Sequence, residues 1–283
     1  MAEIFNPFSL QGKTILVTGA SAGIGKATAI SCAKMGAQVI ITARNEERLN
    51  ATLAEMPGDN LAVKADLTSA SDVEALVAAL PKLDGVVQCA GVGSRVPCKM
   101  ISAENIAEVM QPNFDAPVLL QTALLRNKKI NKEASIVFIA SRAANAPSMG
   151  NAVYSASKGA ILAYSKVLAL ELAPRLIRVN CICPAMVWTE LIFNNGGVTE
   201  EELLESEQKY PLKRYGKPED VANLCLYLLS DASSWMTGSA IDLTGGGENS
   251  DTLIDFGVIF LHIVTLRKLI QDGILKSFNL LHS

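Results

Sequence analysis

The sequence predicts an α/β fold: a single doubly wound domain whose helices cover both faces of a parallel sheet. Short runs rich in valine, isoleucine and leucine alternate along the chain with longer helical patterns. Most of the short runs are apolar at nearly every position, which is typical of strands buried on both faces. Repeated strand–helix–strand units with right-handed crossovers build one open parallel sheet.

The expected strands are seven and span residues 14–18, 38–42, 61–64, 85–88, 135–140, 178–182 and 240–243. Clear helical patterns span residues 24–35, 72–80, 152–172 and 219–229. Ser71 with Glu74 fits a capping box for the second helix, and Pro218 suits the first turn of the fourth. Because no linker or repeat interrupts the chain before residue 245, we expect one domain over residues 1–250.

The composition argues against several classes of protein. With 283 residues, 49% apolar and 19% charged, the chain is suited to a folded domain with a sizeable core. The net charge is −3 and no cluster of lysine and arginine stands out, so we expect no nucleic-acid partner. The N-terminal stretch does not read as a secretory signal, and a cytoplasmic protein is the expectation.

The cysteines and histidines argue against a metal centre. The cysteines form no C-x-x-C pair and are expected to be mostly buried and reduced; they are Cys32, Cys89, Cys98, Cys181, Cys183 and Cys225. His262 and His282 are the only histidines. Histidine general-base chemistry and histidine-rich metal sites are therefore not expected in the first 250 residues.

A glycine-rich turn, TGASAGIGKATAI, follows the first expected strand. Gly19, Gly23 and Gly25 have the spacing G-x3-G-x-G, which permits positive φ and a close approach to a ligand. The next helix points backbone amides and its positive end at a phosphate. A Walker A loop fits poorly, since Ala27 stands where serine or threonine is needed. The turn predicts a Rossmann-type dinucleotide site; a tight structural turn is the alternative.

The end of the second strand, IITARNEER, bears on the choice of cofactor. An acidic residue at this point usually binds the adenosine ribose of NAD. Here Ala43 stands in that position and Arg44 follows, and an arginine can bind a 2′-phosphate. NADP(H) is therefore favoured over NAD(H). The alternative is that Arg44 is a solvated loop residue.

Further motifs follow in a fixed order. They are T-G-x3-G-x-G at 18–25, ADL at 65–67, CAG at 89–91, Asn113 in MQPNFDAP, Ser141 in FIAS, YSASK at 154–158, CPAMVWT at 183–189 and TGSAIDLTGG at 237–246. Because of these motifs, the chain resembles the short-chain dehydrogenase/reductase family, including its 3-oxoacyl-[acyl-carrier-protein] reductase-like members. The resemblance covers approximately residues 9–247. Two motifs depart from the family: Cys89 replaces an asparagine of N-N-A-G, and Ala185 replaces the glycine of P-G.

The resemblance implies a role for each matching residue. Asn113, Ser141, Tyr154 and Lys158 would be catalytic, with Asn113 holding a water in a proton relay. Asp66 would contact the adenine, and Pro184 and Thr189 the nicotinamide. Both Asp66 and Asn113 have a purely structural alternative. Asp66 could be a polar loop residue, and Asn113 could be a helix residue whose side chain bonds the backbone. The implied cofactor contacts are Gly19, Ser21, Gly23, Ile24, Gly25, Arg44, Asp66, Leu67, Ala90, Gly91, Tyr154, Lys158, Pro184, Val187 and Thr189.

The pair of Tyr154 and Lys158 has its own physical logic. Positions i and i+4 share one face of a helix, so the lysine can approach the phenol or a cofactor ribose. A free tyrosine has a pKa near ~10, and exchange of protons at neutral pH needs roughly 4 kcal/mol in favour of the phenolate. An ammonium and an oxidised nicotinamide both favour the phenolate. Ser141, which ends the preceding strand, can hydrogen-bond a substrate carbonyl.

These features together predict an enzyme. It would transfer a hydride between NADP(H) and a small carbonyl or secondary alcohol, and the substrate could be a 3-oxoacyl thioester, a sugar-derived ketone or a xenobiotic carbonyl. The alternative from another class is a non-catalytic dinucleotide sensor or scaffold on the same fold. The family resemblance further implies a homotetramer or homodimer that uses the long helices before and after Ser141.

The last segment, residues 251–283, extends beyond the usual end of such a domain. Its apolar residues follow helical spacing, but its uninterrupted apolar run is far below the ~18 residues of a membrane span. Three alternatives stay open: packing on the domain or a neighbouring subunit, lying on a membrane surface, or an extension without function. We expect no spanning segment, and His262 to lie on the polar face.

Overall fold

The computed structural model describes residues 6–194 and 199–247 and confirms the predicted doubly wound α/β fold. In this part of the chain, the strands form one seven-stranded parallel sheet in the order β3-β2-β1-β4-β5-β6-β7. The strands are β1 (Thr14–Thr18), β2 (Gln38–Ala43), β3 (Leu61–Lys64), β4 (Leu83–Gln88), β5 (Ile130–Ile139), β6 (Arg178–Pro184) and β7 (Ala240–Leu243). The expected tail, with His262 and His282, lies outside the described residues.

Strand β5 differs most from the prediction, because it begins at Ile130 rather than at residue 135. Lys132 and Glu133 interrupt the apolar pattern, which hides the first half of the strand from sequence analysis. Ile130 nevertheless pairs with Leu83 of β4, and the register between these two strands then shifts. Glu133 has a φ of 65°, a left-handed conformation that fits such an irregularity.

The helices are α1 (Gly23–Lys34), α2 (Glu46–Ala54), α3 (Ala70–Ala79), α4 (Ala103–Met110), α5 (Ala116–Arg126), α6 (Ala152–Leu172), α7 (Glu190–Asn194), α8 (Glu200–Glu207) and α9 (Pro218–Leu229). Helix α6 has the predicted bounds, and Pro218 begins α9 as expected. The predicted capping box of α3 is wrong: the capping residue is Ser69, whose hydroxyl accepts a hydrogen bond from the Asp72 amide at 3.3 Å. None of the described helices is both long and apolar enough to cross a membrane.

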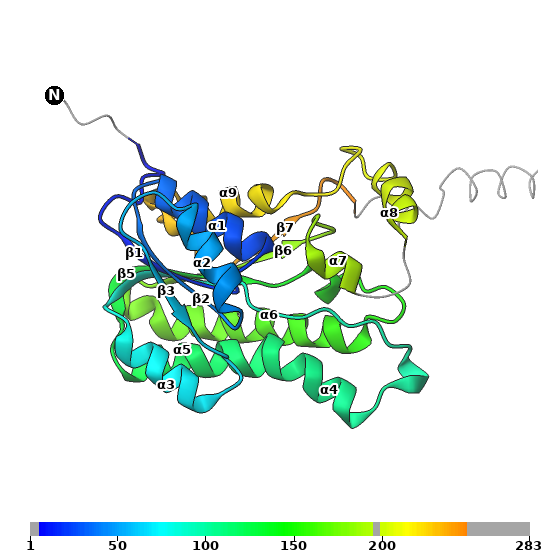
Figure 1. Ribbon diagram of the computed structural model, residues 1–283, viewed down its shortest axis with the longest axis horizontal. Coiled ribbons are helices and arrows are strands. Elements are labelled where there is room, and N and C mark those ends of the chain that lie inside the picture. Colours follow the sequence, from blue (N-terminus) through cyan, green and yellow to red (C-terminus); the bar gives the residue numbers. More distant parts are fainter. Residues whose placement is uncertain (1–5, 195–198, 248–283) are drawn as a thin grey trace, which may run out of the picture.

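Helices cover both faces of the sheet, and each face has its own apolar core. Figure 1 shows α1, α2 and α9 over one face and α3, α4, α5 and α6 over the other. One core joins alternate strand residues such as Val17 and Ile41 to α1 and α9. The other joins Leu16, Val86 and Phe138 to α3, α5 and α6. The strands are therefore buried on both faces, which explains their unbroken apolar runs.

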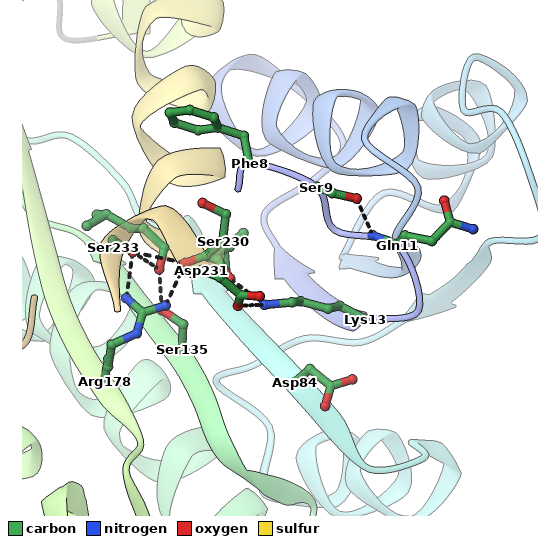
Figure 2. Close-up of polar contacts among 12 residues, drawn as sticks. Phe8, Ser9, Gln11, Lys13, Asp84, Ser135, Arg178, Ser230, Asp231 and Ser233 are labelled. Atoms are coloured by element: carbon green, nitrogen blue, oxygen red, sulfur yellow. Dashed lines mark hydrogen bonds and ion pairs between the residues drawn. The ribbon is translucent and has the colours of Figure 1, made fainter. Parts of the chain in front are cut away.

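The amino ends of the central strands are tied to the end of α9 by a polar network (Figure 2). Arg178 of β6 donates to the Ser233 hydroxyl at 2.7 Å and to the Ser230 carbonyl at 3.1 Å. Ser135 of β5 donates to the carbonyl of Leu228 at 2.6 Å. Lys13, just before β1, forms an ion pair of 2.5 Å with Asp231. This network lies at the opposite ends of the strands from the site described next.

The strand order places the change of winding direction between β1 and β4. From β1 the chain first adds β2 and β3 on one side, and then crosses to add β4, β5, β6 and β7 on the other. Ligands of open α/β sheets bind beside the carboxyl ends of the strands at this switch point. The predicted glycine turn follows β1, and the CAG motif follows β4, so both lie there.

Candidate active site

The turn between β1 and α1 has glycines at positions where a side chain would be strained or would clash. Gly19 and Gly23 have φ values of 64° and 52°, the left-handed region that favours glycine. A Cβ on Gly19 would lie 2.9 Å from the Cα of Ala90, and one on Gly25 would lie 2.3 Å from the carbonyl oxygen of Gly19. The turn is therefore folded tightly against the chain that follows β4.

The start of α1 carries the features that an anion-binding helix needs. Ala22 precedes the helix and supplies no side-chain cap, and the first turn contains no acidic residue. The first amides and the positive end of the helix dipole are thus not offset by a local carboxylate. Ser21 is half-buried in the turn, while Ile24 packs against the core on the α1 face.

Thr18 joins the ends of the two strands at the switch point. Its hydroxyl accepts hydrogen bonds from the amides of Cys89 at 3.1 Å and Ala90 at 3.2 Å. Gly91, the next residue, is as tightly enclosed as the glycine turn. A Cβ there would lie 2.9 Å from Asn113 Oδ1 and 3.4 Å from Lys158 Nζ. The segment after β4 therefore connects the glycine turn to two of the predicted catalytic residues.

The ends of β2 and β3 form the other side of the candidate cofactor site. Ala43 is buried and Arg44 is exposed. Two hydrogen bonds from Thr68, at 2.7 Å from its hydroxyl and 2.9 Å from its amide, hold the pKa of Asp66 below its usual range. The positive charge of Arg44 lowers that pKa further. Leu67 is buried in the core.

Helix α6 brings Tyr154 and Lys158 to the ends of β5 and β6. The Lys158 ammonium lies 5.9 Å from the centre of the Tyr154 ring and donates a hydrogen bond of 3.0 Å to the carbonyl of Ile139. It is 6% exposed, so it does not point into bulk solvent. Ser141 lies at the end of β5, and its hydroxyl forms a hydrogen bond with the Tyr154 side chain that opposes the effect of burial on the tyrosine.

Burial acts on the acidity of both groups. Desolvation lowers the pKa of Lys158 from 10.5 to about 8. Desolvation raises the pKa of Tyr154, and the hydrogen bond from Ser141 offsets this in part. The lowered phenol pKa expected from the sequence is thus not produced by the chain's own groups, because burial of the phenol outweighs the effect of its neighbours.

Asn113 lies in a π-helical turn, Gln111–Asp115, between α4 and α5. Its Oδ1 accepts from the amide of Val92 at 2.7 Å, and its Nδ2 donates to the carbonyl of Val92 at 2.9 Å. Nδ2 also donates to the Ser157 hydroxyl at 3.1 Å. The side chain therefore binds backbone, as the alternative prediction had it. The residue four positions after Asn113 is Pro117, which has no N–H to donate to the Asn113 carbonyl.

The residues after β6 close the site from the other side. Pro184 ends β6 and is buried, and Val187 pairs with Gly216 in a parallel bridge. A Cβ on Gly23 would lie 3.2 Å from the Thr189 methyl group, so Thr189 packs against the glycine turn. In the next helix, Glu190 forms an ion pair of 2.5 Å with Arg48 of α2. The predicted nicotinamide contacts and the glycine turn are thus neighbours.

The cysteines are free thiols, and four of them are buried as expected: Cys32, Cys181, Cys183 and Cys225. Cys98 differs, because it is exposed. Cys89 is half-buried, and desolvation holds the pKa of its thiol well above the ordinary value. Within residues 6–194 and 199–247, no group of three or more histidine, cysteine, aspartate or glutamate side chains is arranged to bind a metal ion.

Three residues that organise the site were not predicted from the sequence: Thr18, Val92 and Ser157. Thr18 and Ser157 belong to the motifs at 18–25 and 154–158, but their residue types are common and carry no chemical signal alone. Val92 acts through its backbone, which the sequence cannot reveal. Pro112 and Pro117 inside a helical pattern were the available signal for the irregular turn at Asn113.

A family model described as enoyl-(acyl carrier protein) reductase matches residues 19–248. The chain belongs to the short-chain dehydrogenase/reductase family of oxidoreductases. The 3-oxoacyl-[acyl-carrier-protein] reductase FabG of Rickettsia felis is 34% identical over 238 residues, which are 84% of this chain and 97% of that protein.

Two solved structures extend the comparison. The 3-ketoacyl-(acyl-carrier-protein) reductase of Brucella melitensis, complexed with NADH, is 31% identical with a TM-score of 0.76 over 84% of this chain and 99% of that one. A candidate NAD(P)-dependent gluconate 5-dehydrogenase of Beutenbergia cavernae, with NADP bound at low occupancy, is 32% identical, with a TM-score of 0.76 over 86% of this chain and 99% of that one. The similarity therefore spans nearly the whole of these proteins.

Proposed function

We propose that the protein is an NADP(H)-dependent oxidoreductase that interconverts a carbonyl and a secondary alcohol, with Tyr154 as the general acid and base. One observation carries the proposal. Tyr154 lies near Ser141 and a buried Lys158, and Lys158 lies beside Gly91, at the same strand ends as the glycine turn. A nucleotide held by that turn would extend toward these side chains.

The cofactor would lie along the carboxyl ends of the strands. The turn from Gly19 to Gly25 and the start of α1 suit its pyrophosphate, since backbone amides can approach closely there. Arg44, exposed at the end of β2 with no carboxylate in the position of Ala43, suits a 2′-phosphate. Pro184, Val187 and Thr189 would border the nicotinamide. The NADP in the Beutenbergia cavernae structure supports this choice, while the Brucella melitensis structure contains NADH.

The reduced nicotinamide supplies the hydride, and the side chains manage the charge that develops on the substrate oxygen. As that oxygen becomes negative, Ser141 donates a hydrogen bond to it and Tyr154 transfers its phenolic proton. The substrate carbon gains the hydride, its oxygen gains the proton, and a secondary alcohol leaves. Burial keeps the phenol protonated before reaction, which suits an acid. The Lys158 ammonium then stabilises the phenolate that remains.

The phenolate must regain a proton before the next turnover. The Asn113 carbonyl, which lacks a donor from Pro117, is suited to hold a water that relays this proton through Lys158. Gly91 supports this placement, because Asn113 and Lys158 both lie against it. We therefore assign Asn113 its relay role through the backbone carbonyl rather than through the side-chain amide.

For the substrate we favour a 3-oxoacyl thioester, on the names of the FabG relatives, over a sugar-derived ketone or a xenobiotic carbonyl.

The assembly we propose is a homodimer or homotetramer that packs through α4, α5 and α6. Leu119 on α5 and Leu170 on α6 are 60% and 77% exposed, which suits a face covered by a second copy. We also propose a cytoplasmic location.

The test is NADPH oxidation against a panel of 3-oxoacyl thioesters, sugar-derived ketones and small ketones, with Tyr154→Phe as the matched variant. We expect turnover by the wild type and a loss of about 10³-fold or more in Tyr154→Phe, with NADPH affinity within threefold. If wild type and variant both bind NADPH and neither reduces any substrate, the non-catalytic sensor is the correct function.

A further inference from the structure

A single hydroxyl, that of Ser157, connects the π-helical turn to the helix that carries the tyrosine. It accepts a hydrogen bond from Asn113 Nδ2 at 3.1 Å and donates one to the backbone carbonyl of Tyr154 at 2.7 Å. Ser157 is completely buried, so water cannot replace either bond. From the geometry we propose that Ser157 is a positioning residue for the reaction proposed above, and that it acts through Asn113 and Tyr154.

The bonds around Ser157 form one continuous chain. The segment after β4 binds Asn113 through both backbone groups of Val92, at 2.7 and 2.9 Å. Asn113 binds Ser157, and Ser157 binds the first turn of α6 at Tyr154. These bonds therefore fix the relative positions of three segments that are far apart in sequence. They are the segment after β4, the π-helical turn that contains Asn113, and the start of α6.

The direction of each bond is fixed by the chemistry of the partners. The Tyr154 carbonyl can only accept, so the Ser157 hydroxyl hydrogen points toward it and the Ser157 oxygen can only accept from Asn113. The Asn113 amide accordingly turns its nitrogen to Ser157 and its oxygen to the Val92 amide. Ser157 thus fixes the orientation of Asn113 as well as the position of the helix turn.

Loss of this hydroxyl leaves a buried Asn113 N–H without a hydrogen-bond partner. The π-helical turn and α6 can then shift relative to each other. A small misplacement of a proton donor reduces turnover much more than ground-state binding. Ser157 touches neither substrate nor cofactor in this scheme. We therefore expect its loss to lower kcat while NADPH binding is retained.

Helix α6 also supplies a matched control. Ser165 is buried two turns later and likewise donates to the carbonyl three residues before it, that of Leu162, at 3.0 Å. Its other partner is the Cys181 thiol at 3.0 Å rather than Asn113. Ser157→Ala and Ser165→Ala therefore remove the same kind of local bond from the same helix, and only the first removes a link to Asn113.

The experiment compares kcat, KM and NADPH affinity of these two variants with wild type, together with the Asn113→Ala double variants. We expect Ser157→Ala to lower kcat roughly tenfold with KM and NADPH affinity within twofold, and Ser165→Ala to keep kcat within twofold. The effects of Asn113→Ala and Ser157→Ala should not multiply, whereas those of Asn113→Ala and Ser165→Ala should.

Two results overturn the inference: equal kcat values in the two serine variants, or multiplicative losses in Asn113→Ala/Ser157→Ala. Should Ser157→Ala fail to fold, Ser157→Cys and Ser165→Cys give the same comparison with side chains of nearly unchanged size. A wild type that binds NADPH but reduces nothing contradicts the proposed function instead, so the two failures are distinguishable.

Discussion

The ammonium of Lys158 lies 5.9 Å from the centre of the Tyr154 ring, but the partner to which it donates a hydrogen bond is the carbonyl of Ile139. The lysine is thus held by the end of strand β5, and it meets the tyrosine as a nearby positive charge. Its burial lowers its pKa to about 8, so the folded protein bears an energetic cost to keep it charged at neutral pH.

That cost predicts a trade-off between stability and activity at Lys158. Lys158→Met should abolish turnover yet raise the free energy of unfolding of the cofactor-free protein by about 1–3 kcal/mol at pH 7. The folded pKa of about 8 is below the unfolded value of 10.5, so the unfolded state binds more protons between them. Wild-type stability relative to the variant therefore rises with pH across that window.

Urea unfolding of both proteins at several pH values between 7 and 10.5 measures this difference. Lys166→Met, at an exposed position of the same helix, is the control, and its difference from wild type should not follow this course. A constant gap between wild type and Lys158→Met across the window would show that Lys158 carries no such cost.

The glycine turn predicts a sharp contrast between two substitutions by alanine. In Gly25→Ala the new Cβ meets the Gly19 carbonyl oxygen at 2.3 Å, a backbone contact that cannot move alone. We expect NADPH affinity to fall at least tenfold and stability to fall by about 2 kcal/mol. In Gly159→Ala the new Cβ meets no atom within 4 Å apart from its chain neighbours and the nearby backbone of its own helix. This variant should gain up to about 1 kcal/mol from helix propensity. Thermal unfolding and NADPH titration of the pair decide the matter.

Arg44 tests the preference for NADP(H). Arg44→Ala should weaken NADPH binding about tenfold and leave NADH binding unchanged, because the guanidinium would contact only the 2′-phosphate. Titration of both nucleotides gives the ratio of affinities. Arg126→Ala, at the end of α5, removes the same charge elsewhere. An unchanged ratio in Arg44→Ala, or an equal change in both variants, would remove Arg44 from the site.

The network at the amino ends of the strands predicts a loss of stability without a loss of function. Arg178→Met removes hydrogen bonds to Ser233 and Ser230 that fasten α9 to β6. We expect the free energy of unfolding to fall by about 1–3 kcal/mol. At a temperature where the variant remains folded, kcat should stay within twofold of wild type, since the site lies at the other ends of the strands. A lower kcat in fully folded Arg178→Met would contradict this separation.

Much of the fold could be predicted from periodicity and the order of the motifs. The apolar runs predicted every strand of the described sheet, and the spacing of Tyr154 and Lys158 predicted their common face of α6. The first half of β5 could not be predicted, because pairing with β4 overrides the charged residues Lys132 and Glu133 there. It also placed the start of α3 too late, since Ser69 and Ser71 are both capable of capping.

The acidity of Tyr154 and the bonding of Asn113 were beyond sequence analysis for a physical reason. Both depend on how deeply a side chain is buried and on which backbone groups face it. A motif gives the residue type at a position, whereas desolvation of the phenol and the two bonds from Asn113 to Val92 arise only from tertiary packing. For the same reason Ser157 looked like any helix residue until its partners were known.

The Thr18 hydroxyl accepts hydrogen bonds from the amides of Cys89 and Ala90, which lie 71 and 72 positions later in the chain. If β1 and β2 pair while the chain is still being synthesised, the other edge of β1 stays unpaired until β4 has emerged, although β1 ends as a central strand. An apolar strand with an open edge invites pairing with a wrong partner. Mutations that delay the arrival of β4 should thus lower the yield of soluble protein in cells, even where the finished enzyme is as stable and active as before.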